Sequence, residues 1–317
     1  MVDTLHGHLW TVLPKLADTL APVPAPHDAP WETTVHDPRL GALRLTGWLR
    51  ARPHADTLFV LLHGLGGSHD SYYVASMARW CDRAGASYLR FNMRGADRSG
   101  EDIYHAGSTD DLRAMLASAD LARFGTIYLV GFSMGGHLAL RWATEAGRDP
   151  RVAAVASVCA PLDLGYGAEA IQRPLGLPYQ WNVLRGLKEM LRPAAMRGRS
   201  PIDFEAARGI RTIMEWDDRV VVPRFGFASR QEYYDTQSAG PRMATIEVPT
   251  LFVAAERDPM VTADQLRPWL AEASDAVEVT WTSGGHIGFP NLAIGERDPG
   301  PIEPQILRWL LRHRASR

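Results

Sequence analysis

The clearest indication of the fold is the stretch Thr126-Ile-Tyr-Leu-Val-Gly-Phe-Ser-Met-Gly-Gly136. Residues 126–130 are predicted as a strand, and a helix is predicted to begin at Met134. Between them, Gly131-Phe-Ser-Met-Gly135 matches G-x-S-x-G, which at a strand-to-helix turn is typical of a nucleophile elbow. The glycines permit the sharp turn, and the helix dipole favours negative charge developing beside the serine. The stretch therefore predicts that Ser133 is a nucleophile exposed above the edge of a sheet.

Strands and helices alternate along the chain on both sides of this stretch. Strands are predicted at 32–36, 42–50, 57–62, 87–92, 126–130, 152–159, 250–254 and 277–281. Helices are predicted at 71–84, 109–118, 134–145, 262–273 and 304–314, and Thr262 with Gln265 has the spacing of a capping box. This alternation predicts an α/β fold, with a mostly parallel central sheet and helices on both faces.

A long insertion separates the strand that ends near Cys159 from the strand at Thr250–Ala254. It contains the helix-start signals Ser200-Pro-Ile-Asp203 and Ser229-Arg-Gln-Glu232, and an amphipathic pattern around Leu187. We expect a helical lid over the carboxyl ends of the strands, where ligands bind in open α/β sheets. The predicted domains are a core of residues 1–160 and 247–317 and a lid of residues 161–246.

The composition is that of a soluble globular protein. The chain has 317 residues, of which 46% are hydrophobic and 22% charged, and its net charge is −2. This balance gives no basic field to attract nucleic acid, so that class of partner is excluded. Two cysteines, Cys81 and Cys159, cannot form a disulfide framework, and the N-terminus lacks the pattern of a signal peptide. We therefore expect a cytoplasmic protein.

Residues 5–20 are predicted as a helix that docks on the core, and residues 21–30 as a Pro/Ala linker. Leucines such as Leu9 and Leu13 could instead contact a membrane surface. A helix lying on a membrane usually carries more lysine and arginine than this one. The sequence favours docking and allows at most peripheral membrane contact.

A serine hydroxyl is a weak nucleophile and needs a base. Gly284-Gly-His286 follows the last predicted strand, and Asp258 follows the strand before it. In a triad, His286 would take the serine proton, and Asp258 would hold the imidazole tautomer and stabilise the imidazolium. Glu256 and Asp163, which also follow predicted strands, remain alternatives for the acid.

The glycine-rich stretch His63-Gly-Leu-Gly-Gly67 follows the first buried strand. Such a loop can present the backbone N–H of Leu65 to an oxyanion, and the N–H of Met134 would be the second donor. The residues expected to support this loop are His63, Gly64, Gly66 and Gly67. His63 is predicted to be a structural prop and not a second base.

Other polar residues are predicted to have structural roles. His105 and Asp110 have the H-x4-D spacing that some acyltransferases use, but they lie beside the expected start of a helix. Asp217 and Asp218 are expected to anchor the lid, for instance to an arginine. The sequence contains no metal-ligand cluster, dinucleotide fingerprint or P-loop, so neither a metal nor a cofactor is expected.

Motifs spread over nearly the whole chain resemble the YheT-like branch of the α/β-hydrolase superfamily. They are Gly7-His-Leu-Trp-Thr11, His63–Ser68, Asn92-Met-Arg-Gly95, Gly131–Gly136, Trp216-Asp-Asp-Arg219, Pro223-Arg-Phe-Gly226, Tyr233-Tyr234, Asp258-Pro259 and Gly284-Gly-His-Ile-Gly288. The resemblance implies the α/β-hydrolase fold, a carboxylesterase or lipase activity, phospholipid substrates in some relatives, and the triad already named. The chain departs from the branch at Trp10, where glutamine is expected, and at Arg94-Gly-Ala-Asp97, where Arg-Gly-Cys-Gly is more familiar.

The sequence thus predicts a serine hydrolase that cleaves acyl esters, with lipids among the candidate substrates, through an acyl-enzyme. An acyltransferase or a C–C bond hydrolase with the same triad is an alternative, as is a non-catalytic ligand-binding homologue. Haloalkane dehalogenases and epoxide hydrolases are disfavoured, because they use aspartate where Ser133 stands.

Overall fold

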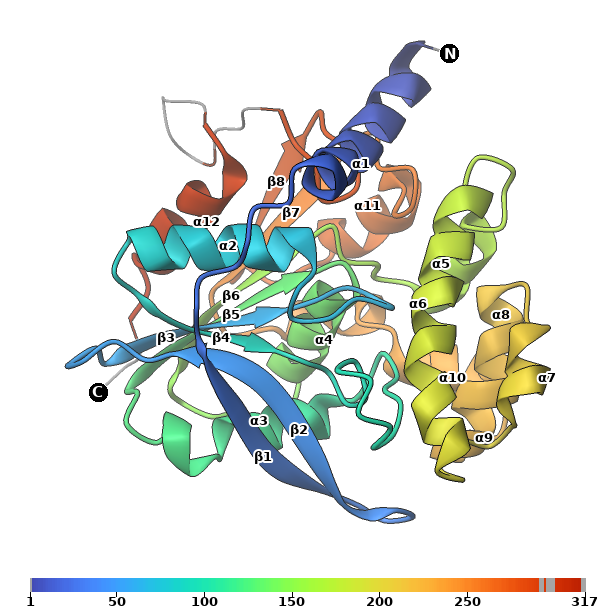
Figure 1. Ribbon diagram of the computed structural model, residues 1–317. Coiled ribbons are helices and arrows are strands. Elements are labelled where there is room, and N and C mark those ends of the chain that lie inside the picture. Colours follow the sequence, from blue (N-terminus) through green and yellow to red (C-terminus); the bar gives the residue numbers. More distant parts are fainter. Residues whose placement is uncertain (1, 291–293, 295–299, 315–317) are drawn as a thin grey trace.

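The computed structural model describes residues 2–290, 294 and 300–314. Within these residues an eight-stranded sheet has the order β1-β2-β4-β3-β5-β6-β7-β8 (Figure 1). The strands are β1 (Ala29–Asp37), β2 (Gly41–Arg50), β3 (Thr57–Leu62), β4 (Ser87–Phe91), β5 (Thr126–Phe132), β6 (Val152–Val158), β7 (Thr250–Ala255) and β8 (Val277–Thr282). The β1–β2 and β2–β4 pairs are antiparallel, and β3 to β8 form a parallel block. The predicted mostly parallel sheet is confirmed.

The central strands are apolar throughout because helices cover both faces of the sheet. In β3, Leu58 and Val60 belong to one hydrophobic core, whereas Phe59 and Leu61 belong to the core on the opposite face. The helices on the Phe59 side are α2 (Tyr72–Arg83) and α12 (Ile302–Leu310). Those on the other side are α3 (Thr109–Leu116), α4 (Met134–Ala143) and α11 (Ala263–Ala271). This two-sided burial explains why β3 reads as an uninterrupted apolar run.

The insertion between β6 and β7 is helical and lies beside one end of the sheet (Figure 1). It contains α5 (Leu164–Ala170), α6 (Leu177–Met196), α7 (Phe204–Arg208), α8 (Ile213–Trp216), a π-helical turn (Asp217–Val221), α9 (Val222–Phe225) and α10 (Arg230–Gln237). The hydroxyl of Ser229 accepts a hydrogen bond from the N–H of Glu232, as the capping signal predicts. In the other signal Asp203 is the capping residue, accepting from the N–H of Ala206.

Two predicted local features differ in the structure. Strand β1 begins at Ala29, inside the predicted Pro/Ala linker, because Ala29 and Pro30 pair with the end of β2. The capping box at the start of α11 does not form: the Thr262 hydroxyl has no partner in the described chain, and neither do the polar side-chain atoms of Gln265. Gln265 is buried beneath the helix and does not reach back to its N-terminus.

Helix α1 (Val2–Leu20) packs on the loops that follow β7 and β8. A side chain at Gly7 would come within 1.8 Å of the carbonyl oxygen of Arg257, so the helix approaches these loops through its smallest residue. The large apolar residues of this helix are about half exposed or more: Leu5, Leu9, Val12, Leu13, Leu16 and Leu20. Among the described residues, no helix is both long and apolar enough to cross a membrane.

Candidate active site

Ser133 stands on a strained turn at the carboxyl end of β5. Its φ of 51° and ψ of −118° lie in a region that residues with a side chain rarely adopt. The turn is tight. A Cβ at Gly131 would lie 2.3 Å from the carbonyl oxygen of Gly135, and a Cβ at Gly135 would lie 2.5 Å from the carbonyl oxygen of His63. Glycine is therefore required at both flanking positions. The structure has the strand–turn–helix geometry that the motif predicts.

His286 and Asp258 are brought together from the loops after β8 and β7. His286 Nδ1 and Asp258 Oδ2 are 2.8 Å apart, and both side chains are buried. The other carboxylate oxygen of Asp258 accepts hydrogen bonds from the backbone N–H groups of Met260 and Val261, at 2.8 and 2.9 Å. These bonds fix the carboxylate, so its Oδ2 faces the imidazole and Nε2 of His286 is left for another partner.

The two alternative acids lie elsewhere. Asp163 caps α5, where its Oδ1 accepts a hydrogen bond from the N–H of Tyr166 at 2.9 Å. Glu256 forms a surface ion pair with Arg267 at 2.6 Å. Asp258 is therefore the carboxylate that meets His286.

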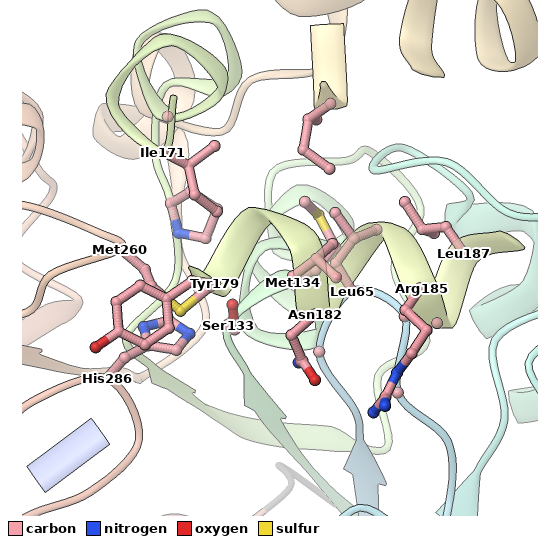
Figure 2. A pocket seen from close by; sticks show the side chains of 18 of the residues that line it. Leu65, Ser133, Met134, Ile171, Tyr179, Asn182, Arg185, Leu187, Met260 and His286 are labelled. Atoms are coloured by element: carbon pink, nitrogen blue, oxygen red, sulfur yellow. The ribbon is translucent and has the colours of Figure 1, made fainter. Parts of the chain in front are cut away.

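The glycine-rich loop is held by two phenols. The N–H of Gly64 donates to Tyr73 Oη at 2.9 Å, and the N–H of Gly66 donates to Tyr104 Oη at 2.8 Å. The N–H of Leu65, between them, has no acceptor in the described chain, and neither has that of Met134. Leu65 and Met134 both line the cavity that contains Ser133, beside which Figure 2 shows them.

His63 lies beneath this loop and is fully buried. Its Nε2 accepts a hydrogen bond from the N–H of Met93 at 3.2 Å, so its proton sits on Nδ1 and is donated to the carbonyl oxygen of Gly64 at 2.8 Å. Burial lowers the pKa of His63 to about 4, which keeps the ring neutral near pH 7. Both ring nitrogens are used within the fold, as a structural prop requires.

His105 and Asp110 do not form a catalytic pair. Nδ1 of His105 accepts a hydrogen bond from the N–H of Gly107, whereas the exposed Asp110 pairs with Arg113. Burial lowers the pKa of His105 to about 3. Asp110 therefore provides neither a partner nor a proton path for His105.

The two adjacent aspartates of the insertion have different surroundings. Asp218 pairs with Arg230, which is the kind of anchor that was expected. Asp217 is buried, lines the cavity, and accepts a hydrogen bond from Tyr234 Oη at 2.7 Å. The sequence assigned both residues the same anchoring role, and for Asp217 the partner is a phenol and not an arginine.

Sequence reasoning also missed Thr11. Its hydroxyl accepts a hydrogen bond from the backbone N–H of His286 at 2.8 Å and donates one to the carbonyl oxygen of Gly7. The available signal was the motif Gly7-His-Leu-Trp-Thr11, which was recognised without a role. Helix α1 thus holds the histidine loop from a position far away in the sequence.

One group of possible metal ligands occurs in the described chain: Cys159, Asp258 and His286, whose ligand atoms lie within 4.8 Å of one another. A metal would need a thiolate at Cys159. Burial raises the pKa of this thiol well above its ordinary value, so it stays protonated. Nδ1 of His286 already faces the carboxylate of Asp258. These donors fit a histidine–carboxylate pair better than a metal centre.

The cavity beside Ser133 has a volume of about 710 Å³, within the usual range for small-molecule sites. It lies between the core and α6, and Figure 2 shows Ser133 and His286 facing it beneath that helix. The apolar side chains labelled there are Leu65, Met134, Ile171, Leu187 and Met260, and Asn182 and Arg185 of α6 add polar groups to the wall. The arrangement can accept an apolar molecule and bring a polar bond of it to the serine.

The sheet, the elbow and the order Ser133, Asp258, His286 define the α/β-hydrolase class. The sequence pattern of the alpha/beta hydrolase fold family matches residues 57–291, and the chain belongs to this family.

Within the family the chain is YheT-like, as its motifs predicted. It is 31% identical to YheT of Escherichia coli (strain K12), named as an esterase, over 73% of this chain and 69% of YheT. It is 28% identical to monoacylglycerol lipase of Saccharomyces cerevisiae (strain ATCC 204508 / S288c) and 26% identical to phospholipase ABHD3 of Mus musculus. These matches cover 74% and 73% of this chain but only 55% and 57% of the two relatives. The chain therefore groups with esterase- and lipase-type α/β-hydrolases.

Solved structures support the fold. The esterase Pf2001 of Pyrococcus furiosus superposes with a TM-score of 0.55 at 17% identity, over 82% of this chain and 84% of that one. The α/β-hydrolase GrgF of Penicillium sp. sh18 gives a TM-score of 0.55 at 18% identity, over 92% and 100% of the two chains. At such identities the similarity concerns the fold alone.

Proposed function

We propose that this protein is a serine hydrolase that cleaves carboxylic esters through an acyl-enzyme. The observation that carries the proposal is the 2.8 Å contact between His286 Nδ1 and Asp258 Oδ2, on the wall of the cavity that Ser133 also lines. A buried carboxylate on Nδ1 leaves Nε2 of the imidazole free to act as the base for a nucleophile in the same cavity. No other acid–base pair of the described chain stands beside a serine on a strained turn.

In the proposed reaction, Ser133 Oγ attacks the ester carbonyl carbon while its proton passes to His286 Nε2. The N–H groups of Leu65 and Met134 stabilise the oxyanion of the tetrahedral intermediate. When the intermediate collapses, the C–O bond breaks and the alcohol leaves with the proton from His286. Water then attacks the acyl-enzyme by the same route, releasing the acid and restoring Ser133.

The cavity supports an apolar ester of small to medium size as the substrate. Its volume of about 710 Å³ and its apolar lining suit an acyl chain better than a strongly charged molecule. The names of similar proteins include lipases of monoacylglycerols and phospholipids, which supports a lipid-type ester. We further propose that residues 161–246 act as a lid, because α6 lies over the cavity.

Acyl transfer is the second candidate. The chain is 26% identical to the medium-chain fatty acid ethyl ester synthase/esterase 2 of Saccharomyces cerevisiae (strain ATCC 204508 / S288c), whose name includes ester synthesis. The acyl-enzyme would be the same, and an alcohol would replace water as the acceptor. Analysis of the products formed with ethanol present separates the two: a transferase gives mainly the ethyl ester even when water is in large excess.

The test combines active-site labelling with hydrolysis of p-nitrophenyl esters of short and medium acyl chains. A fluorophosphonate probe should label Ser133, and Ser133→Ala should abolish labelling and lower kcat by about 10⁴-fold or more. His286→Ala should behave similarly, while Asp163→Asn, which changes the alternative acid, should retain activity. A folded wild-type protein that neither reacts with the probe nor hydrolyses any of these esters would refute the proposal.

A further inference from the structure

Asp217 is a buried carboxyl group in the wall of the cavity. Its exposed fraction is 6%, and it lies at the start of the π-helical turn between α8 and α9. Such turns insert one extra residue into a helix and occur frequently at functional sites. Asp217 lies on the helical insertion, whereas Ser133 lies on the core, and both line the same cavity.

The hydrogen bonds of Asp217 are incomplete. Its Oδ2 accepts from Tyr234 Oη at 2.7 Å, and its Oδ1 receives no hydrogen bond from the described residues. Arg230, the arginine whose charge acts on Asp217, donates a hydrogen bond to the neighbouring Asp218. Although the residue is buried, this oxygen keeps some accessible surface, so it can be reached by a molecule in the cavity that Asp217 lines.

A purely structural role would call for a carboxylate with all its partners supplied, and the same protein contains such a case. Asp111, also buried, receives hydrogen bonds from the guanidinium of Arg94 on both of its oxygens. Asp217, in contrast, accepts one hydrogen bond from the phenol of Tyr234, and its Oδ1 has no partner among the described residues at the cavity wall. A molecule in the cavity can therefore donate a hydrogen bond to this oxygen.

The charge of the surroundings indicates the chemistry of that ligand. Burial raises the pKa of Asp217 to about 7, so near neutral pH the group is protonated in a large part of the molecules and can both donate and accept. A negatively charged ligand would meet the carboxyl group itself, and Arg230, the arginine whose charge acts on Asp217, is paired with Asp218 and offers such a ligand no free charge. A neutral hydroxyl group, which also donates and accepts, fits both constraints.

We propose that Asp217 and Tyr234 form a polar subsite that binds a hydroxyl group of the ester substrate, away from the scissile bond. This inference rests on the proposed esterase function and specifies its substrate class as hydroxylated apolar esters. The apolar lining binds the chain, and the subsite selects the hydroxyl group. The motifs Trp216-Asp-Asp-Arg219 and Tyr233-Tyr234 acquire a common role, since Asp217 and Tyr234 meet at the cavity.

The test compares pairs of esters that differ only by a hydroxyl group in place of a methyl group at the far end of the chain. One series carries the hydroxyl group on the acyl chain, and the other carries it on the alcohol. In at least one series and at one chain length, the wild-type kcat/KM should favour the hydroxylated ester by roughly 10- to 100-fold. Equal kcat/KM values for all pairs in both series would overturn the inference.

Variants locate the preference. Asp217→Leu and Tyr234→Phe should each bring the ratio of the two kcat/KM values close to one, whereas Asp218→Asn, a matched change at the next residue, should leave it unchanged. A ratio that persists in Asp217→Leu would contradict the proposal. If Asp217→Leu does not fold, Tyr234→Phe, which removes only the phenol oxygen, gives the same decision. Failure of the esterase proposal looks different, because the wild type would then cleave neither member of a pair.

Discussion

At the scale of single residues, the buried Tyr104 and the partly buried Tyr73 determine what the glycine-rich loop can do. Tyr73 and Tyr104 accept hydrogen bonds from the N–H groups on either side of Leu65. Because the flanking amides are occupied, the loop is fixed in a geometry that leaves the N–H of Leu65 without an acceptor among the residues the structure describes. The phenols therefore prepare a donor in advance, which is what stabilisation of an oxyanion requires.

The first prediction concerns Tyr104. Tyr104→Phe removes the acceptor for the Gly66 N–H, so the loop should lose part of its fixed orientation. We expect kcat for a p-nitrophenyl ester to fall by about 10-fold with little change in KM, less than the 10²- to 10³-fold cost of losing an oxyanion donor outright. Tyr88→Phe is the control, because this buried tyrosine bonds to Asp28 far from the cavity. An unchanged kcat in Tyr104→Phe would show that the phenol does not position the loop.

The second prediction uses the pKa of Asp217. Burial raises it from 3.8 to about 7, so between these values the folded state binds more protons than the unfolded state. The contribution of Asp217 to stability is therefore present below about pH 4 and is lost as the pH rises towards 7, by up to roughly 1.4 kcal/mol per pH unit. Asp217→Asn does not titrate, so its stability relative to the wild type should increase as the pH rises.

Urea denaturation at about pH 5 and about pH 8 measures this effect. The difference in unfolding free energy between Asp217→Asn and the wild type should shift in favour of the variant at the higher pH. The exposed Asp218→Asn is the control and should show much less pH dependence. A difference between Asp217→Asn and the wild type that is the same at both pH values would mean that the carboxyl group is not perturbed by burial.

At the scale of elements, α1 acts as a brace for the histidine loop. It reaches that loop through Gly7 and Thr11, where a Cβ on Gly285 would lie 2.0 Å from the carbonyl oxygen of Gly7. The opposite face of the helix, which carries leucines such as Leu9 and Leu13, is exposed. The small and polar face therefore makes the functional contact, and the apolar face makes little contact with the core.

The third prediction separates these two faces. Thr11→Val keeps the shape of the side chain but removes the hydroxyl that accepts from the His286 N–H. We expect a loss of about 1 kcal/mol in stability and a fall in kcat of about 10-fold, because the imidazole is less well held. Leu13→Gln, on the exposed face of the same helix, should change stability by no more than about 0.5 kcal/mol and leave kcat unaltered. Equal effects of the two changes would remove the distinction between the faces.

The elements that the sequence predicted best are those whose pattern is set by local burial. The runs 57–62 and 126–130 became β3 and β5 because two-sided burial demands apolar side chains at every position. Two features could not be predicted: which face of α1 packs on the core, and the π-helical turn. An apolar stripe does not say whether it faces the core, and the sequence does not say that Asp217 is buried in the π-helical turn while the adjacent Asp218 is exposed.

At the scale of the whole molecule, a buried group of charges joins three distant parts of the chain. Arg224 of α9 donates to Asp37 of the β1–β2 hairpin at 2.8 Å and to Asp102 at 2.5 and 2.8 Å. Arg94, in the loop after β4, donates to Asp37, Asp102 and Asp111. All five side chains are buried, so the insertion is attached to the core by ion pairs as well as by apolar contacts.

The fold class and the placing of Ser133, Asp258 and His286 near one another could be predicted for one physical reason: parallel strands bring their carboxyl ends to a single edge. Ser133, Asp258 and His286 each follow a strand, so their meeting could be inferred. The partners of Arg94 and Arg224 could not, because nothing in the spacing of an arginine and an aspartate far apart in sequence indicates that they pair. The motifs around these arginines were recognised only as a resemblance, and the structure supplies their role.

The last prediction concerns the attachment of the insertion. Arg224→Met keeps much of the side-chain volume but leaves Asp37 and Asp102 with fewer partners in a buried environment. Breaking a buried ion pair from one side costs about 3–5 kcal/mol, whereas an exposed pair contributes about 1 kcal/mol or less. Arg208→Met, which removes the exposed pair with Glu205 on α7 of the same insertion, is the matched control. Urea denaturation should therefore show a large loss of stability for Arg224→Met and almost none for Arg208→Met. Similar small losses in both would mean that apolar packing alone holds the insertion against the core.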